Sequence, residues 1–194
     1  MPKKPETNLR ELTLEDWAGS NPSPLQQAQD LCWDAWDEPD RNKARRMARK
    51  ALKISPDCAD AYNILADTIT SWKKAAELYE QGVKAGRKTL GEAYFKENEG
   101  HFWSLIESRP YIRAVNGLAD CFWHLDRYAE SVGLYQEILR LNPGDNIGVR
   151  FILVSKLIIL KRDEEARAIL KRYRGEERAV AFPAYNMEIG RAHV

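Results

Sequence analysis

The residues of this chain that could do chemistry are few, and the first group is a cysteine–histidine pair. Cys121 and His124 stand three residues apart, so a helix would place both side chains on one side. A zinc site needs three or four such ligands, and the sequence offers no partner cluster for this pair. We therefore interpret Cys121 as a core residue and His124 as a residue on the side of a groove, and we expect no metal site.

His101 forms the second group, because acidic side chains surround it in the sequence. A base beside carboxylates can transfer protons in a reaction. No nucleophile motif and no glycine-rich phosphate loop accompanies His101, so we interpret it as structural, together with Phe102 and Trp103. An enzyme that uses His101 with these glutamates stays open as an alternative. The acidic neighbours are Glu97, Glu99 and Glu107.

A basic stripe is the third candidate for chemistry, because six of the ten residues 41–50 are Lys or Arg. Such a stripe can bind phosphate groups. Here, however, the basic residues alternate with small ones at helical spacing, namely Ala44, Ala48 and Ala51. We expect a solvated outer helix face. The whole chain has 30 basic and 29 acidic residues, so no overall charge draws it to nucleic acid or to an anionic membrane.

Composition further restricts the class of protein. A hydrophobic fraction of 44% is enough to build a core. The longest apolar run, residues 151–160, is interrupted by Ser155 and Lys156 and falls short of the ~20 residues that span a bilayer. The first residues lack the apolar stretch of a signal peptide. Three widely spaced cysteines suit a reducing compartment, and we expect a cytoplasmic protein.

A repeated residue pattern predicts the helices that must position any site. A helix pair that ends at a proline and then restarts is typical of a solenoid repeat about 34 residues long. One such pair cannot bury its own apolar face, so neighbouring pairs stack and present a concave surface. Two copies share the pattern: Ala44, Ala48, Ala51, Leu52 and Pro56 in the first, and Ser131, Tyr135, Ile138, Leu139 and Pro143 in the second.

This pattern resembles the tetratricopeptide repeat, most clearly at Leu118, Ala119, Phe122, Tyr128, Ser131, Tyr135, Ile138 and Pro143. Val115 stands where the family has its signature Trp, and Ser131 replaces the usual Ala of the second helix. The resemblance implies an all-α, right-handed solenoid of helical hairpins. The whole arrangement is also similar to bacterial proteins related to the suppressor of tumorigenicity 7 family, through residues 55–62, 100–103, 109–111 and 142–146. That resemblance implies a helical scaffold and supplies no catalytic residue.

These repeats predict how the chain is divided. We expect a mobile leader over residues 1–24, with Leu12, Leu14 and Trp17 able to dock on the first repeat. An insertion over 87–111 breaks the period, and we expect Phe102, Trp103, Leu105 and Ile106 to pack inward from it. Residues 188–194 match the translation of a sequencing adapter, so we expect the natural chain to continue past Met187. Repeats are predicted at about 25–58, 59–86, 112–145 and 146–175, with a partial one at 179–187.

The resemblance also implies where a partner would bind. Positions 2, 5, 9 and 12 of each tetratricopeptide unit line the concave groove. Counted from Ala59, these positions are Asp60, Asn63 and Asp67. Counted from Ile112, they are Arg113, Asn116, Asp120 and Trp123, and Arg150 extends the row. Asn can hold a peptide backbone, Arg a carboxylate, and Trp an anchoring side chain. The alternative is that these are ordinary surface residues.

We therefore expect a non-catalytic adaptor that binds a peptide segment or a helix of a partner protein, without a cofactor. The acidic C-terminal tail of a chaperone is not the expected ligand, because Asp67 and Asp120 stand where positive or neutral donors are needed. A second possibility is the scaffold part of a longer protein whose activity lies elsewhere.

Overall fold

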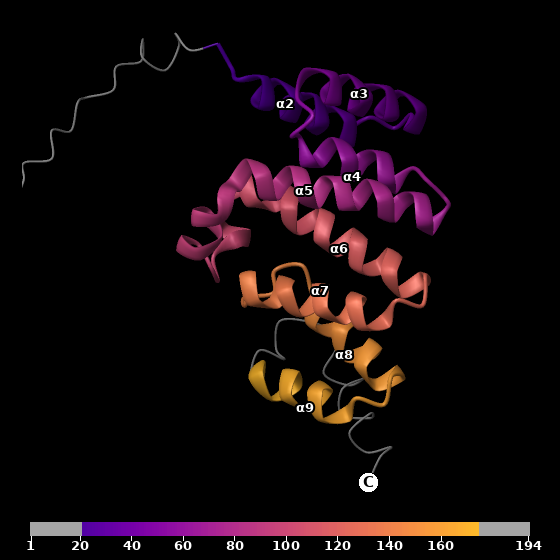
Figure 1. The fold of residues 1–194 in the computed structure, drawn as a ribbon, viewed down its shortest axis with the longest axis vertical. Coiled ribbons are helices and arrows are strands. Elements are labelled where there is room, and N and C mark those ends of the chain that lie inside the picture. The colour runs from indigo at the N-terminus through magenta and orange to yellow at the C-terminus, as the bar shows by residue number, and fades with distance from the viewer. Residues whose placement is uncertain (1–20, 175–194) are drawn as a thin grey trace, which may run out of the picture.

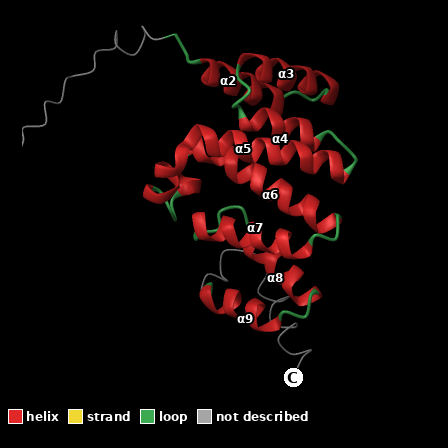
Figure 2. Ribbon diagram, in the orientation of Figure 1, coloured by secondary structure: helices red, strands yellow, loops and turns green. Residues whose placement is uncertain are grey.

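The computed structural model describes residues 21–174 (Figure 1). The predicted leader up to residue 20, the partial fifth repeat and the adapter-like residues therefore lie outside the described residues. Residues 21–174 form helices and no strand (Figure 2), and none of these helices is long and apolar enough to cross a membrane. The all-α prediction is confirmed. The elements are α2 (Pro24–Trp36), α3 (Arg41–Ile54), α4 (Ala59–Asp67), α5 (Trp72–Glu97), η1 (Phe102–Ser104), η2 (Ile106–Ser108), α6 (Arg109–His124), α7 (Tyr128–Leu141), α8 (Val149–Ile159) and α9 (Asp163–Arg172).

Consecutive helices pack as hairpins, and the hairpins stack in one row from α2 to α9 (Figure 1). Within the hairpins, α2 packs on α3, α4 on α5, α6 on α7, and α8 on α9. The first helices of neighbouring hairpins also touch, because α4 contacts both α2 and α6. The predicted solenoid of helical hairpins is confirmed, and α2, α4 and α6 line one continuous side of it.

Local sequence signals explain where these helices begin. Pro24 occupies the first turn of α2, and the hydroxyl of Ser23 accepts a hydrogen bond from the Gln26 N–H at 3.2 Å. The turn after the prolyl segment works in the same way, because the buried carboxylate of Asp145 accepts the N–H of Val149 at 2.6 Å. Each cap satisfies N–H groups that have no partner within the helix, so the helix restarts at the position that the repeat predicts.

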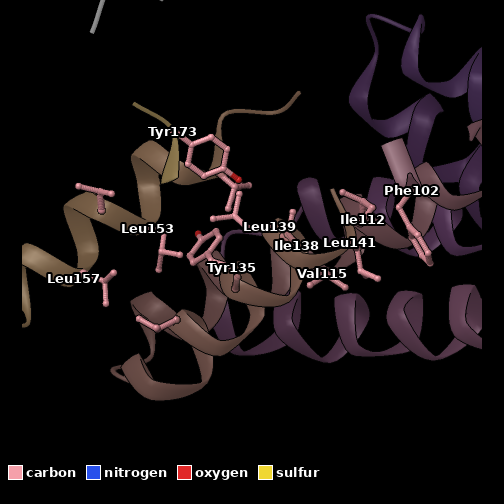
Figure 3. Packing of buried hydrophobic residues seen from close by; sticks show 14 of the residues in the cluster. Phe102, Ile112, Val115, Tyr135, Ile138, Leu139, Leu141, Leu153, Leu157 and Tyr173 are labelled. Atoms are coloured by element: carbon pink, nitrogen blue, oxygen red, sulfur yellow. The ribbon is translucent and has the colours of Figure 1, made fainter. Parts of the chain in front are cut away.

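The core runs along the stack and follows the predicted apolar positions. In the first hairpin Ala44, Ala48 and Ala51 are buried, and their small size lets the two helices lie close together. From α6 to α8 the core is larger, and Tyr135 is completely buried in one cluster with Phe102 and Leu153 (Figure 3). The three cysteines are buried free thiols. Residues chosen by the repeat pattern therefore do hold the hairpins together.

The insertion extends α5 and then folds back onto the stack. Gly91 has a φ of 76°, a conformation that glycine tolerates, and it breaks α5 near its end. Phe102 is completely buried and packs on Phe95, with ring centroids 5.0 Å apart. The expectation that Ile106 packs inward is wrong, because this side chain is 61% exposed. The single turn η2 buries Ser108 instead, whose hydroxyl donates to the Phe102 carbonyl.

Candidate functional site

Most of the predicted groove residues lie on two neighbouring first helices. Arg113, Asn116, Asp120 and Trp123 are spaced by three, four and three residues along α6, so they share one helix face. Asn63 and Asp67 lie on α4, which contacts α6 directly. The structure therefore brings six of the seven predicted residues to the side lined by first helices.

A buried carboxylate, Asp60, ties three first helices together. Its side chain is completely buried. Arg113 of α6 donates to Asp60 Oδ1 from Nε at 2.9 Å and to Oδ2 from Nη2 at 2.6 Å. Gln29 of α2 donates to Oδ2 at 2.7 Å, and Asn63 donates to Oδ1 at 3.0 Å. A buried charge requires such partners, so Asp60 and Arg113 hold the groove together.

The contacts of Arg113 continue the row of groove residues onto α2. Its guanidinium carbon lies 4.5 Å from the ring centroid of Trp36, at the end of α2. A cation over an indole ring is attracted to its electron-rich face. Two of the Arg113 donors are directed to Asp60. Arg113 is thus a fixed part of the groove wall, and part of its capacity to hold a partner carboxylate is already used.

The predicted residues of α4 are also engaged within the protein. Asn63 is buried, and its Nδ2 donates to the Pro110 carbonyl at 3.0 Å as well as to Asp60. Asp67 is exposed and accepts the hydroxyl proton of Tyr79. Burial, and then the hydrogen bond to Asp67, raise the pKa of Tyr79 well above its usual range. Asn63 therefore holds the start of α6 in place, and Asp67 anchors the second helix of its own hairpin.

Lys156, which the sequence analysis did not select, contacts the C-terminal part of the row on α6. Lys156 of α8 is buried, with its Nζ 3.7 Å from Asp120 Oδ1 and 4.3 Å from the centre of the Trp123 ring. Desolvation lowers the pKa of this ammonium, and the Asp120 carboxylate opposes the change. Asp120 also accepts the Tyr135 hydroxyl. The signal for Lys156 was present, because this residue interrupts the longest apolar run.

Within residues 21–174, Asn116 has a side-chain oxygen without a partner, as does Asn63 on α4. The Oδ1 of Asn116 is buried and has no hydrogen bond to any of the residues that the structure describes. An unpaired buried amide oxygen is costly unless a ligand or water supplies a donor. It lies between Arg113 and Asp120 in the row on α6. Asn116 therefore keeps an unused acceptor, which becomes available to the backbone N–H of a bound peptide when the side chain rotates outward.

Arg150 lies apart from this row. Its Nε is 3.5 Å from Asp145 Oδ2, and its guanidinium lies 4.7 Å from the ring centroid of Tyr173, at the end of α9. Lys156 is six residues further along α8, which places it about 120° away around the helix. Lys156, and not Arg150, is therefore the α8 residue that contacts Asp120 and Trp123.

Sequence reasoning missed a pocket that lies between α2 and the start of α6. It has a volume of about 370 Å³, which is within the range of ligand pockets. Trp33, Trp36 and Ile106 line it and are 48%, 39% and 61% exposed. The count of groove positions, begun at Leu25, yields Gln26, Gln29, Trp33 and Trp36, all of which line this pocket. The lining residues that come from the insertion carried no signal in the repeat; they are Thr89, Ile106, Glu107, Arg109 and Pro110.

Cys121, His124 and His101 lie in different surroundings. Cys121 is buried, and burial raises the pKa of its thiol to about 11. His124 stacks on Trp72 with the ring centroids 3.9 Å apart. Between residues 21 and 174, no group of three or more His, Cys, Asp or Glu side chains could hold a metal ion. His101 is exposed, and Glu99 pairs with Arg140. An enzyme that uses His101 stays an untested alternative.

Comparison with known proteins identifies the repeat. A family model described as tetratricopeptide repeat matches residues 104–146, which comprise η2, α6, α7 and the turn that follows. A tetratricopeptide repeat therefore lies within residues 104–146. The resemblance predicted from Leu118 to Pro143 is confirmed. Tetratricopeptide repeats are in general protein-interaction scaffolds, in agreement with the stacked hairpins.

Three curated relatives of this chain are suppressor of tumorigenicity 7 protein-like proteins. The human protein is 25% identical over 144 residues, the bovine one 26% over 146, and the chicken one 27% over 148. Each match covers 72% of this chain, and the chain spans about a quarter of the length of these relatives. A solved structure described as the functional characterization of Pseudomonas aeruginosa pilF is 20% identical, with a TM-score of 0.37; the match covers 77% of this chain and 75% of that one.

Proposed function

We propose that the side lined by α2, α4 and α6 binds a peptide segment or a helix of a partner protein. The tetratricopeptide repeats support a protein-interaction scaffold in general. The observation that carries the finer proposal is the contact between Trp36 and Arg113, because it joins the row on α6 to two exposed tryptophans on α2. Exposed aromatic rings beside fixed polar groups are typical of the centres of binding surfaces.

The bound chain would use two kinds of contact. The Oδ1 of Asn116 is buried and unpaired in the free protein, and after rotation of the side chain it can accept a backbone N–H, which would give affinity without sequence preference. Trp33 and Trp36 can cover a bulky apolar side chain, which would give preference for particular sequences. The ion pairs of Asp60 with Arg113 and of Asp120 with Lys156 keep this surface ordered before binding. Preorganisation lowers the entropy lost on association.

A displayed library of random peptides, selected on the full chain, tests this proposal. The recovered peptides are titrated against Trp33→Ala and Asn116→Ala, and Lys50→Ala on the exposed face of α3 serves as the matched control. We expect each groove variant to weaken binding about ten-fold, or ~1.4 kcal/mol, and the control to bind unchanged. Arg113→Ala is avoided, because it would leave Asp60 buried without its cation. Equal binding to all three variants, or no enrichment on the wild type, would overturn the proposal.

A second candidate function follows from length. The curated relatives are about four times as long as the stretch they share with this chain. We propose as the alternative that the repeats are the binding module of a longer protein whose activity lies elsewhere. Sequencing the source gene beyond codon 194 tests this. A reading frame that stops there would contradict it, whereas an open frame would supply the additional domain for assay.

A further inference from the structure

The pocket between α2 and the start of α6, here called the tryptophan pocket, has walls of two kinds. Its apolar side is formed by Leu25, Trp33 and Trp36 of α2, with Ile106 of η2. These side chains are partly or largely uncovered, although apolar area gains free energy from burial. Because Ile106 comes from the insertion, this pocket is a feature of the chain beyond its repeats.

The other side of the tryptophan pocket favours negative charge. Arg109 and Arg113 line it, and α4 and α6 begin there, with Ala59 and Arg109 as their first residues. Because Arg113 is already paired with buried Asp60, Arg109 is the main cation left for a ligand. Helix N-termini carry a partial positive charge that attracts carboxylates. Of the two acidic residues that line the pocket, Glu107 is exposed, and Asp57 is held by Lys88 Nζ at 2.7 Å. A fitting ligand therefore has bulky apolar side chains next to carboxylates.

One segment of the chain itself has this chemistry. Residues 11–17 read Glu-Leu-Thr-Leu-Glu-Asp-Trp and contain no Lys or Arg. We propose that this segment occupies the tryptophan pocket of its own molecule and thereby competes with a partner peptide for the groove. The inference rests on the proposed function, which it deepens by adding its regulation. The matching side chains are Leu12, Leu14 and Trp17 for the apolar wall, and Glu11, Glu15 and Asp16 for the basic one.

The covalent connection makes this docking sterically possible. Ser23 lines the tryptophan pocket, and the carbonyl of Pro22 accepts a hydrogen bond from Gln27 Nε2 at 2.7 Å. The six steps from Trp17 to Ser23 span up to ~20 Å when extended. The 13 residues of α2 also span ~20 Å, so the segment can reach back along the helix. Gly19, Asn21 and Pro22 are residue types that favour such a turn.

The tether also makes weak docking sufficient. A segment joined by a short linker has an effective concentration in the millimolar range. A partner peptide must therefore bind tightly enough to displace this tethered segment before it can contact Trp33 and Trp36. Removing the anchor by Trp17→Ala should strengthen the binding of library peptides whose affinity depends on Trp33.

A photo-crosslinking experiment on the full chain tests the inference directly. Trp17 is replaced by p-benzoylphenylalanine, whose aromatic rings stand in for the indole, and the irradiated protein is digested and analysed by mass spectrometry. We expect cross-links to peptides that contain residues 25–36 or 106–113. Trp36→Ala should lower the yield at least about five-fold, because one wall of the pocket is removed. Trp72→Ala, another exposed tryptophan outside the pocket, is the matched control and should not change the yield.

Mixing ¹⁴N and ¹⁵N chains separates docking within one molecule from docking between two. Cross-links between two chains would overturn the inference in favour of a second copy as the occupant. Cross-links elsewhere on the surface, no cross-links, or a yield unaffected by Trp36→Ala would overturn it as well. If library peptides still bind the groove in any of these cases, only this inference fails and the proposed function stands.

Discussion

Asp60 accepts two hydrogen bonds from the guanidinium of Arg113, a residue 53 positions further along the chain. The carboxylate is completely buried at the start of α4, whereas the arginine side chain is 33% exposed on α6. This asymmetry means that the two partners do not depend equally on each other. The carboxylate cannot regain water when its cation is removed, whereas the guanidinium can.

Arg113→Ala should therefore destabilise the protein by about 3 kcal/mol, because it leaves a buried charge without its cation. The same substitution made in an Asp60→Asn background should cost less than about 1 kcal/mol, since a neutral amide needs no cation. Urea unfolding of the wild type, both single variants and the double variant measures this difference. Additive costs would show that the pair contributes nothing beyond its separate side chains.

Gly117→Ala should destabilise the protein by about 1–3 kcal/mol through overpacking. A Cβ at this position of α6 would overlap the ring of Tyr79, whose hydroxyl is held by Asp67, so the ring cannot swing away freely. Gly133→Ala on α7 is the matched control, because its Cβ would meet nothing within 4 Å. The control should be neutral or stabilise the helix by up to about 1 kcal/mol. Thermal unfolding compares the two, and equal effects would argue against the packing of α5 on α6.

Tyr135→Ala should cost about 3–5 kcal/mol, as expected for a buried aromatic side chain. Tyr135 is completely buried, and its hydroxyl donates to Asp120. Tyr135→Phe keeps the ring and removes only that hydrogen bond, so we expect a loss of about 1 kcal/mol. Denaturant unfolding measures both. A loss below about 1 kcal/mol for the alanine variant would contradict the position of Tyr135 in the core.

Stability should fall when the pH rises above 10. Burial, reinforced by hydrogen bonds to Asp67 and Asp120, raises the pKa of Tyr79 and Tyr135 above the ordinary value of 10.0. The folded protein then binds more protons than the unfolded chain at alkaline pH, so the contribution of these groups is complete below pH 10 and is lost above it. The double variant Tyr79→Phe with Tyr135→Phe should lose stability less steeply. Urea unfolding between pH 9 and 11 tests this, and parallel curves would refute it.

The helical hairpins could be predicted from sequence because their causes are local. Ala44, Ala48, Tyr135 and Ile138 recur at helical spacing, and the prolyl turns stop and restart each helix within a few residues. The face shared by Arg113, Asn116, Asp120 and Trp123 follows from the same periodicity, since residues three and four apart on a helix are neighbours. Repeat count and spacing therefore determined both the fold class and the position of the row on α6.

Only the tertiary structure decided what these side chains do. Asp60 meets Arg113, and Lys156 meets Asp120, because separate hairpins stack in register, and no local pattern encodes such distant contacts. The same reason explains Ile106, whose exposure depends on how η2 folds back beside α2. The sequence by itself thus determined a stack of tetratricopeptide hairpins with a polar row on one face. Packing between the hairpins determined which of those residues hold the scaffold together, and it left Trp33 of α2 exposed beside them.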